Sequence, residues 1–355
     1  MAAPYRIGLI GAGNIAPAYI QTFLADERVE VAGIADLNQS RAASRAQEFG
    51  LLSRGIDEML QDKSVDLVVN LTTPDAHEGV GLAILGAGKH LYSEKPLALR
   101  PEGAKGLLSF ARERNLLVGS APDTVLGSGI QTARALLDEG AIGHPVGFAA
   151  HMLCGGHEGW HPNPEFYYQE GGGPMFDMGP YYLSALVQFF GPVRSVMGCV
   201  RTMHQERVRG AGNAIGARIP VETPTHISAQ LLFRSGVVGT LTTSFDTPAH
   251  DLPHIEIWGT EGMLRAPDPN GFGGDTQIKR RGGESETIAP CGNRVGNLRG
   301  LGAIDLLASQ GEDRPARCSG EIAAHVVEVM AGTLRSAEEG EPVHLELEPE
   351  RPWPM

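Results

Sequence analysis

Cysteine is scarce in this sequence. Only four of 355 residues are cysteine, and these residues, Cys154, Cys199, Cys291 and Cys318, form no Cys-x-x-Cys pair. Disulfide frameworks and structural zinc sites need closely and regularly spaced cysteines, so neither is expected and no metal is predicted. Scattered thiols are typical of the reducing cytoplasm, and we expect a cytoplasmic protein.

Long apolar runs and excess positive charge are also missing. No apolar stretch approaches the roughly 20 residues that cross a bilayer, and the first residues show no basic-then-apolar leader. The formal charge is -13, and the one compact basic run is residues 279–281. Because negative charge repels phosphate backbones, a nucleic-acid partner is disfavoured, as are a membrane and export.

The chain is nevertheless long and well supplied with core residues. Its 355 residues exceed what one hydrophobic core usually supports, which predicts two domains. Hydrophobic residues make up 42% and charged residues 20%, a globular rather than a disordered composition. A change of rhythm after residue 120 places the boundary, so we predict domains at 1–121 and 122–355.

The first part alternates short β-branched runs with helix-like segments, which predicts an α/β fold with a doubly wound parallel sheet. The expected strands are residues 5–10, 29–35, 65–71, 90–93 and 116–119, and helices are expected at 40–49 and 77–85. The second part predicts an α/β domain with an open, largely antiparallel mixed sheet. Its expected strands are 146–153, 193–207, 225–233, 237–245 and 255–258, with helices at 129–139 and 319–339.

A G-x-G-x-x-A motif follows the first expected strand and opens a helix. Gly11 permits a tight turn, Gly13 lets the backbone approach a pyrophosphate, and Ala16 allows close packing. The helix N-terminus, with Asn14 and Ile15, offers N–H groups and positive partial charge to phosphate. This context predicts a Rossmann dinucleotide site; the alternative is a plain glycine turn.

An acidic residue ends the second expected strand. Asp36 lies 25 residues after Gly11, where a carboxylate can accept hydrogen bonds from ribose hydroxyls. Its charge would repel the 2′-phosphate of NADP, whereas Arg41 nearby would partly compensate. We therefore predict NAD, with NADP left open; the alternative is a turn or helix-capping aspartate.

Polar residues also follow the third and fourth expected strands, where ligands bind in open α/β sheets. The predicted cofactor-binding residues there are Thr73, Pro74, His77, Glu94 and Lys95. A lysine at this rim can donate a hydrogen bond or, when burial lowers its pKa, move a proton. The alternative is an ordinary Glu-Lys surface pair before a proline turn.

Together these motifs resemble one family. The Gly-x-Gly turn, the Thr-Pro-x-x-His of residues 73–77, the Glu-Lys-Pro of 94–96 and the Gly-Gly-Gly-Pro-Met-Phe-Asp-Met-Gly-Pro-Tyr of 171–181 are similar in order and spacing to the Gfo/Idh/MocA oxidoreductases. The resemblance covers nearly the whole chain. It implies an active site between two domains and a homodimer or homotetramer that uses the second domain's sheet for contacts.

The same resemblance implies three catalytic residues. Lys95 takes the place of the family's catalytic lysine, and Asp177 and Tyr181 match its D-x-G-x-H signature, with tyrosine in place of histidine. Some members that resemble glucose-fructose oxidoreductase carry this tyrosine. An unperturbed tyrosine has a pKa of about 10, so Tyr181 needs tuning, for which a nearby cation such as Lys95 would serve. The alternative is that Tyr181 only lines the pocket, while Pro180 leaves the local helix undecided.

The loop at residues 151–168 is dense in His and Cys, but its spacing matches no common zinc pattern. Trp160, His161 and Tyr168 suit a hydroxylated ring, and we hypothesise that this loop sets substrate choice, together with Asp177 and Tyr181. After the fifth strand many relatives carry a basic residue where this chain has Ala-Pro-Asp-Thr, which disfavours acidic substrates. Asp123 either contacts a sugar hydroxyl or caps a turn.

The sequence thus predicts hydride transfer between NAD(P) and a ring hydroxyl or carbonyl of a sugar, cyclitol or related polyol. Two alternatives stay open. One is redox-assisted cleavage or modification of a glycoside, which would give no net NADH. The other is a non-catalytic, dinucleotide-responsive regulator.

Overall fold

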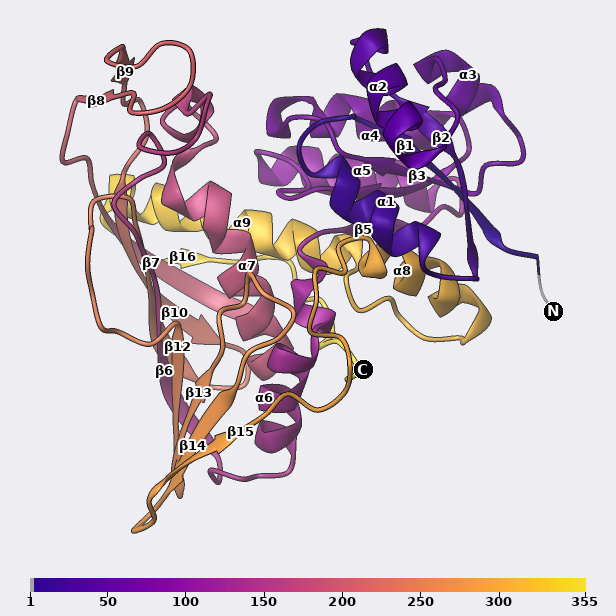
Figure 1. Cartoon of the computed structure of the whole chain (residues 1–355). Coiled ribbons are helices and arrows are strands. Elements are labelled where there is room, and N and C mark those ends of the chain that lie inside the picture. Colours follow the sequence, from indigo (N-terminus) through magenta and orange to yellow (C-terminus); the bar gives the residue numbers. More distant parts are fainter. Residues whose placement is uncertain (1–2) are drawn as a thin grey trace. The chain divides into compact units, whose positions relative to one another are not determined.

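The computed structural model describes residues 3–355, and the chain divides into two compact units (Figure 1). The first contains the chain up to residue 127 together with 293–327 and 352–355, and the second contains 128–292 and 328–351. Neither unit is one continuous stretch. This differs from the predicted division at residue 121, because the segment 293–327 returns to the first unit.

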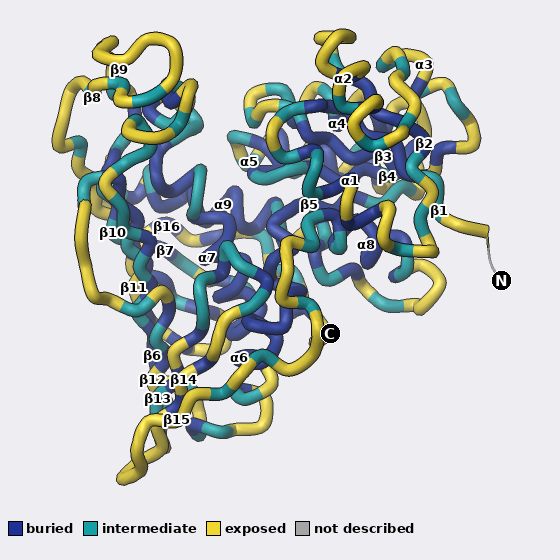
Figure 2. Tube along the Cα trace, viewed as in Figure 1, coloured by how far each residue is buried: buried dark blue, intermediate teal, exposed yellow. Residues whose placement is uncertain are grey.

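The first unit is built on a five-stranded parallel sheet of order β2-β1-β3-β4-β5. The strands are β1 (Tyr5–Ile10), β2 (Val29–Ala35), β3 (Leu67–Asn70), β4 (His90–Ser93) and β5 (Val118–Ser120). Buried residues run along them, as parallel strands covered on both faces require (Figure 2). The predicted doubly wound sheet is confirmed; β3 is shorter than expected and β5 begins two residues later.

Helices α1 (Ala16–Leu24), α2 (Gln39–Phe49), α3 (Ile56–Gln61), α4 (His77–Gly86) and α5 (Pro101–Arg112) connect these strands, with a short 3-10 turn, η1 (Pro74–Ala76), before α4. A second 3-10 turn, η2 (Asp123–Leu126), follows β5, and α8 (Leu301–Gly311) belongs to the returning segment. Local sequence sets their limits: the side chain of Asn38 caps α2, and Gly50 ends it in a left-handed conformation. The long helix α9 (Gly320–Glu339) begins in the first unit's sequence and ends in the second's.

The returning segment is fastened to the end of β5. The backbone N–H of Ser120 donates to the carbonyl of Cys318 at 3.1 Å. The buried carboxylate of Asp123 accepts hydrogen bonds from the N–H groups of Gly300 at 2.7 Å and Gly302 at 3.1 Å, at the start of α8. Asp123 therefore satisfies backbone donors that a helix N-terminus leaves without intrahelical partners.

The second unit is built on a nine-stranded sheet of order β15-β14-β13-β12-β6-β11-β10-β7-β16. Its strands are β6 (Pro145–Leu153), β7 (Val193–Arg201), β10 (His226–Phe233), β11 (Val238–Ser244), β12 (Ile255–Gly259), β13 (Gly262–Ala266), β14 (Thr276–Arg280), β15 (Ser285–Ile288) and β16 (Val343–His344). β6 and β11 pair in parallel, and the other neighbouring pairs of this sheet are antiparallel. The predicted largely antiparallel mixed sheet is confirmed.

Two helices, α6 (Ser128–Asp138) and α7 (Gly173–Phe190), pack on this sheet, and a short turn η3 (Glu165–Tyr167) precedes α7. Phe148 stacks against Phe190 at 5.5 Å between ring centroids and meets Phe233 edge-on at 5.7 Å, which forms the core of the unit. The expected single strand 193–207 is wrong, because β7 ends at Arg201 and a separate hairpin of β8 (Glu206–Val208) and β9 (Arg218–Pro220) follows.

The cap at α8 gives the folded state a pH dependence. Burial raises the pKa of Asp123 from 3.8 to about 6, against the lowering effect of the two N–H donors. The proton is thus held more tightly in the folded chain, so this residue's contribution is fully present below pH 3.8 and is lost as the pH rises through about 6. We predict that the loss amounts to at most about 3 kcal/mol of the free energy of unfolding.

Asp123→Asn keeps an oxygen acceptor but does not titrate. Denaturant unfolding at several pH values should show the wild type gaining stability relative to this variant as the pH falls from about 7 to about 4. A constant difference across that range would contradict the assignment.

Candidate functional site

The turn between β1 and α1 is shaped by its glycines. Gly11 has φ +109°, donates its N–H to the carbonyl of Ala35 at 2.8 Å, and passes so near the carbonyl oxygen of Leu71 that a Cβ would lie 2.5 Å from it. Only glycine fits there. A Cβ on Gly13 would by contrast meet open space, and no side chain caps the N-terminus of α1 at Ile15.

The carboxylate of Asp36 is held at the end of β2. Its Oδ2 accepts the N–H of Ala12 at 2.8 Å and its Oδ1 accepts the N–H of Asn38 at 2.7 Å. The guanidinium of Arg41 lies 3.9 Å away and is largely exposed. Asn38, not Asp36, caps α2. Arg45, which the sequence did not single out, donates to the carbonyl of Gly13 at 3.4 Å.

His77 does not face a ligand as predicted. Its ring is buried, with Nδ1 2.6 Å from the carbonyl of Pro96 and Nε2 3.1 Å from that of Thr72. Burial lowers the pKa of His77, so the neutral ring is favoured, and its single N–H is assigned to the shorter contact, with Pro96. The correction is that His77 ties the start of α4 to the loop after β4, whereas Thr73 is exposed and half-buried Pro74 opens η1.

Asn70, at the end of β3, supports the same loop. Its amide donates to the carbonyl of His77 at 3.1 Å, and its oxygen accepts the hydroxyl of Thr72 at 2.6 Å. The sequence analysis missed this residue because an asparagine at the end of an apolar strand carries no distinctive spacing.

Glu94 and Lys95 follow β4. The carboxylate of Glu94 accepts the hydroxyl of buried Tyr19 at 2.7 Å and the N–H of Lys95 at 3.0 Å. These contacts fix the backbone that carries Lys95, whose side chain is half-buried. The tyrosine partner on α1 was not foreseen.

Asp123 had two possible roles, a sugar contact or a cap. The structure favours the cap, because its side chain is 1% exposed and its Oδ2 is occupied by two N–H donors of α8. Asp123 caps a helix start at Gly300, 177 residues later in the chain. The spacing of residues in the sequence does not reveal so distant a partner.

In the second unit, α7 carries Asp177 and Tyr181 on one continuous helix. The helix begins at Gly173, next to Pro174, and Pro180 lies inside it. Residues four apart on a helix share a face, so Asp177 and Tyr181 lie on the same face of α7, which the sequence left undecided because of Pro180. The start is tight, since a Cβ on Gly172 would lie 2.3 Å from the carbonyl oxygen of Phe166. Tyr181 is 7% exposed.

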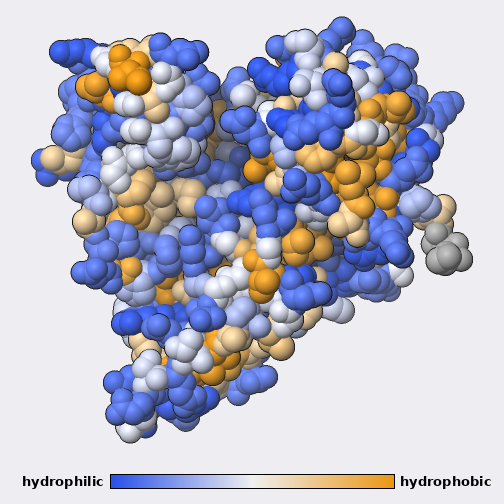
Figure 3. Space-filling view, viewed as in Figure 1, coloured by the Kyte–Doolittle hydropathy of each residue, from blue (hydrophilic) through white to orange (hydrophobic). Residues whose placement is uncertain are grey.

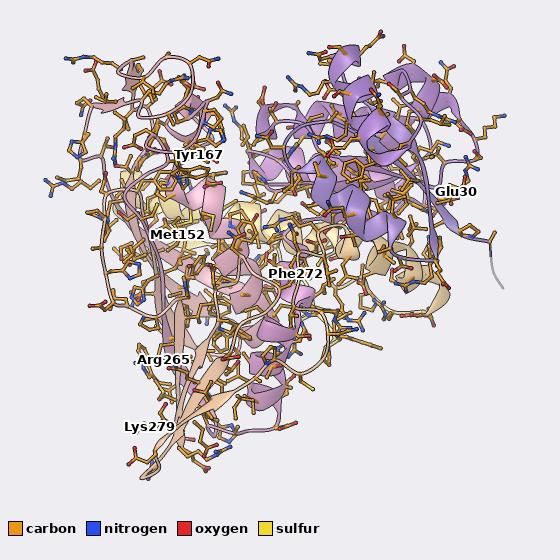
Figure 4. The ribbon with its side chains drawn as sticks, in the orientation of Figure 1. Glu30, Met152, Tyr167, Arg265, Phe272 and Lys279 are labelled. Carbon is orange, nitrogen blue, oxygen red and sulfur yellow. The ribbon has the colours of Figure 1, made fainter. Side chains whose placement is uncertain are left out.

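His157, in the loop before α7, contacts Asp177. Its Nε2 lies 3.1 Å from Oδ2 of Asp177, and both side chains are largely buried. Aromatic rings enclose the imidazole, with centroids at 4.3 Å for Tyr167, 4.6 Å for Phe245 and 5.3 Å for Trp160. Figure 4 labels Tyr167, at the opposite end of this unit from Lys279 of β14.

Tyr168 is not available to a substrate, contrary to prediction. It is 0% exposed, and its hydroxyl donates to the carboxylate of Glu158. Burial raises the pKa of Tyr168, so the phenol stays protonated. Arg207 pairs with Glu158 at 2.9 Å and also with Asp246, so Tyr168 belongs to a buried polar network beneath the loop.

The remaining two loop residues differ in exposure. Trp160 is 62% exposed, while His161 is half-buried between Trp160, Phe166 and Tyr167. The β8–β9 arm, residues 206–220, holds this loop, because Arg209 donates to the carbonyl of Pro162 at 2.8 Å. Figure 3 shows apolar side chains at the end of the arm, where Val208 and Ile215 are exposed.

Within residues 3–355, no group of three or more His, Cys, Asp or Glu side chains is placed to hold a metal ion. No helix in that part of the chain is both long and apolar enough to cross a membrane.

The surface at the carboxyl ends of the parallel strands fits a dinucleotide. It combines open space at Gly13, an uncapped helix N-terminus, and the fixed carboxylate of Asp36 at the end of the neighbouring strand. These features match the needs of a pyrophosphate and a ribose, respectively.

Comparison with protein families agrees with this geometry. The model described as "Oxidoreductase family, NAD-binding Rossmann fold" matches residues 5–121, and the "GFO/IDH/MocA C-terminal domain" matches residues 130–265.

Individual proteins are also similar. The chain is 32% identical to dTDP-3,4-didehydro-2,6-dideoxy-alpha-D-glucose 3-reductase of Actinomadura kijaniata, over 65% of this chain and 69% of that protein. It is 28% identical to 1,5-anhydro-D-fructose reductase of Ensifer adhaerens, over 73% of this chain and 74% of that protein. The crystal structure of an NAD binding oxidoreductase from Klebsiella pneumoniae has the same fold, with a TM-score of 0.84 at 22% identity, covering 97% and 100% of the two chains. The chain belongs to the Gfo/Idh/MocA family of NAD-binding oxidoreductases.

Proposed function

We propose that this protein transfers a hydride between NAD and a ring hydroxyl or carbonyl of a sugar, cyclitol or related polyol. The observation that carries the proposal is that the open turn at Gly13, Asp36 and the Glu94–Lys95 loop follow β1, β2 and β4, whose carboxyl ends lie at the same end of the parallel sheet. The two curated relatives described above are named as reductases of sugar substrates, which supports the substrate class.

The proposed catalytic residues are Lys95, Asp177 and Tyr181. Bound NAD supplies the hydride acceptor or donor. Lys95 polarises the substrate oxygen with its ammonium group, Tyr181 exchanges the hydroxyl proton, and Asp177 orients Tyr181 from the same face of α7. Gly11, Gly13, Asn14 and Ile15 hold the dinucleotide, and Asp36 selects NAD by accepting from ribose hydroxyls.

The substrate is further proposed to contact the exposed surface of the 157–168 loop. Trp160 offers an exposed ring face and His161 an imidazole beside it, which suit the apolar faces and hydroxyls of a sugar ring. We also propose a cytoplasmic location, which the four unpaired cysteines support.

The reaction is tested with purified protein, NAD or NADP, and a panel of sugars, cyclitols and glycosides. We expect reduced nicotinamide to accumulate with one ring substrate. Lys95→Met should lower turnover by about 100-fold to 10,000-fold while NAD binding, measured by calorimetry, is retained. Lys279→Met, at an exposed position of β14, serves as control.

Each other outcome of this assay has a meaning. Substantial turnover in Lys95→Met would refute the catalytic role of the lysine. Product formed without net NADH would favour redox-assisted glycoside chemistry. NAD binding without any turnover across the panel would favour the regulator.

The cofactor preference depends on Asp36. In Asp36→Asn, kcat/KM for NAD should fall by about tenfold, since a charged hydrogen bond to ribose is weakened, and kcat/KM for NADP should rise because the repelling charge is gone. Asp57→Asn, exposed on α3, is the control. An unchanged NAD to NADP ratio would exclude a ribose contact by Asp36.

A homodimer or homotetramer is proposed to form through the face of the nine-stranded sheet that α7 leaves uncovered. One residue from each of five neighbouring strands contributes to an apolar row there: Leu232, Val238, Gly147, Trp258 and Met263. Trp258 is 42% exposed and Val238 39% exposed. Such a continuous apolar row on a sheet marks an interaction surface.

Light scattering should therefore show an oligomer for the wild type. Trp258→Glu places a charge in the apolar row and should shift the mass towards the monomer, whereas Trp353→Glu, at an exposed tryptophan of the first unit, should not. A wild-type monomer at working concentration would reject the proposal.

A further inference from the structure

Four residues after Asp177 the chain has Tyr181, a phenol. The imidazole that contacts Asp177 comes instead from His157, in the loop before α7. His157 lies 20 residues before Asp177 in sequence, and its Nε2 is 3.1 Å from Oδ2. Because a carboxylate only accepts hydrogen bonds, Nε2 carries the hydrogen and Nδ1 is the nitrogen that takes up a second proton.

We propose that His157 is a positioning residue for the reaction: it orients the carboxylate of Asp177, and its uptake of a proton weakens that carboxylate as a hydrogen-bond and proton acceptor. This rests on the proposed function, in which Asp177 orients Tyr181. With a neutral ring at His157, the carboxylate of Asp177 accepts more strongly from the hydroxyl of Tyr181 when the substrate alcohol is oxidised. An imidazolium would compete for the same negative charge.

The packing around His157 leaves its ring little choice of orientation. Tyr167, on the turn before α7, and Phe245, just after β11, both pack against the imidazole ring, and Trp160 packs edge-on. The hydroxyl of Tyr168 lies 3.3 Å from the backbone N–H of His157, which anchors the loop at the same residue. Three rings and a backbone anchor therefore direct Nε2 to Asp177.

Other titratable and charged groups surround the pair from each packed element. They are His161, Tyr167, Tyr168, Glu158 and Cys154 in the loop, Arg207 on β8, and Asp246 after β11. Arg207 pairs with both Glu158 and Asp246, and burial raises the pKa of both Cys154 and Tyr168. The thiol and the phenol thus stay protonated near neutral pH.

The test compares kcat/KM for sugar oxidation across pH 5.5 to 9 in wild type and His157→Gln, a substitution that keeps an N–H donor but does not titrate. The ratio of variant to wild type should rise as the pH falls across this range, because glutamine cannot take up the proton that weakens Asp177 in the wild type. His157→Leu, without a donor, should lose about tenfold at the high-pH end of the range, where only the missing donor separates it from the wild type.

Two further variants isolate the path through Asp177. In an Asp177→Asn background, His157→Gln should change kcat/KM by the same factor at every pH, since there is no carboxylate left to act on. His344→Gln, an exposed histidine of β16, should leave the profile unchanged. Thermal unfolding checks that each variant is folded.

A flat ratio for His157→Gln in the active wild-type background would overturn this inference alone, as would an equal rise towards low pH in the Asp177→Asn background. Absence of turnover in the wild type with every sugar would instead overturn the proposed function, and the role of His157 with it.

Discussion

Parallel pairing of β1 with both β2 and β3 is the constraint on which the first unit depends. It brings the carboxyl ends of these strands, and of β4 beyond them, to one edge, so residues from distant parts of the sequence meet there. At this end of the sheet the backbone of Gly11, after β1, lies directly against the backbone of Leu71, after β3. A side chain at this point would push the turn from the sheet and disturb the positions of Asp36 and Glu94 together.

The second unit obtains its polar site in another way. Asp177 and Tyr181 are arranged by the geometry of a single helix, whereas His157 reaches Asp177 from the irregular stretch of the loop before η3. The loop is ordered by rings around the imidazole and by the buried network of Glu158, Arg207 and Asp246. Breaking one partner of such a network leaves a buried charge uncompensated, which costs more than the pair contributes.

Sequence reasoning succeeded where the signal is local. The strands and the glycine turn follow from alternation, β-branched residues and spacing, whereas the catalytic roles of Lys95, Asp177 and Tyr181 stay predictions that rest on the family motifs. It failed where side chains are satisfied by distant partners. His77 is expected at the ligand but its buried ring contacts the carbonyl of Pro96, and Tyr168 is expected at the substrate but its hydroxyl donates to Glu158. The partner of Asp123 lies beyond residues 128–292 of the second unit in sequence. Nothing in a linear pattern distinguishes a polar side chain that faces a ligand from one that closes a loop.

The return of residues 293–327 to the first unit also constrains how the chain can be made and divided. During synthesis, the parallel sheet leaves the ribosome long before α8 and the carbonyl of Cys318 that complete its edge at β5. Eight of the nine strands of the second unit's sheet, all except β16, are made in between and can begin to fold at that time. The first unit therefore begins before the second but stays incomplete until those strands have been made, and a fragment cut after residue 127 would lack buried core residues of α8 such as Ile304 and Leu306.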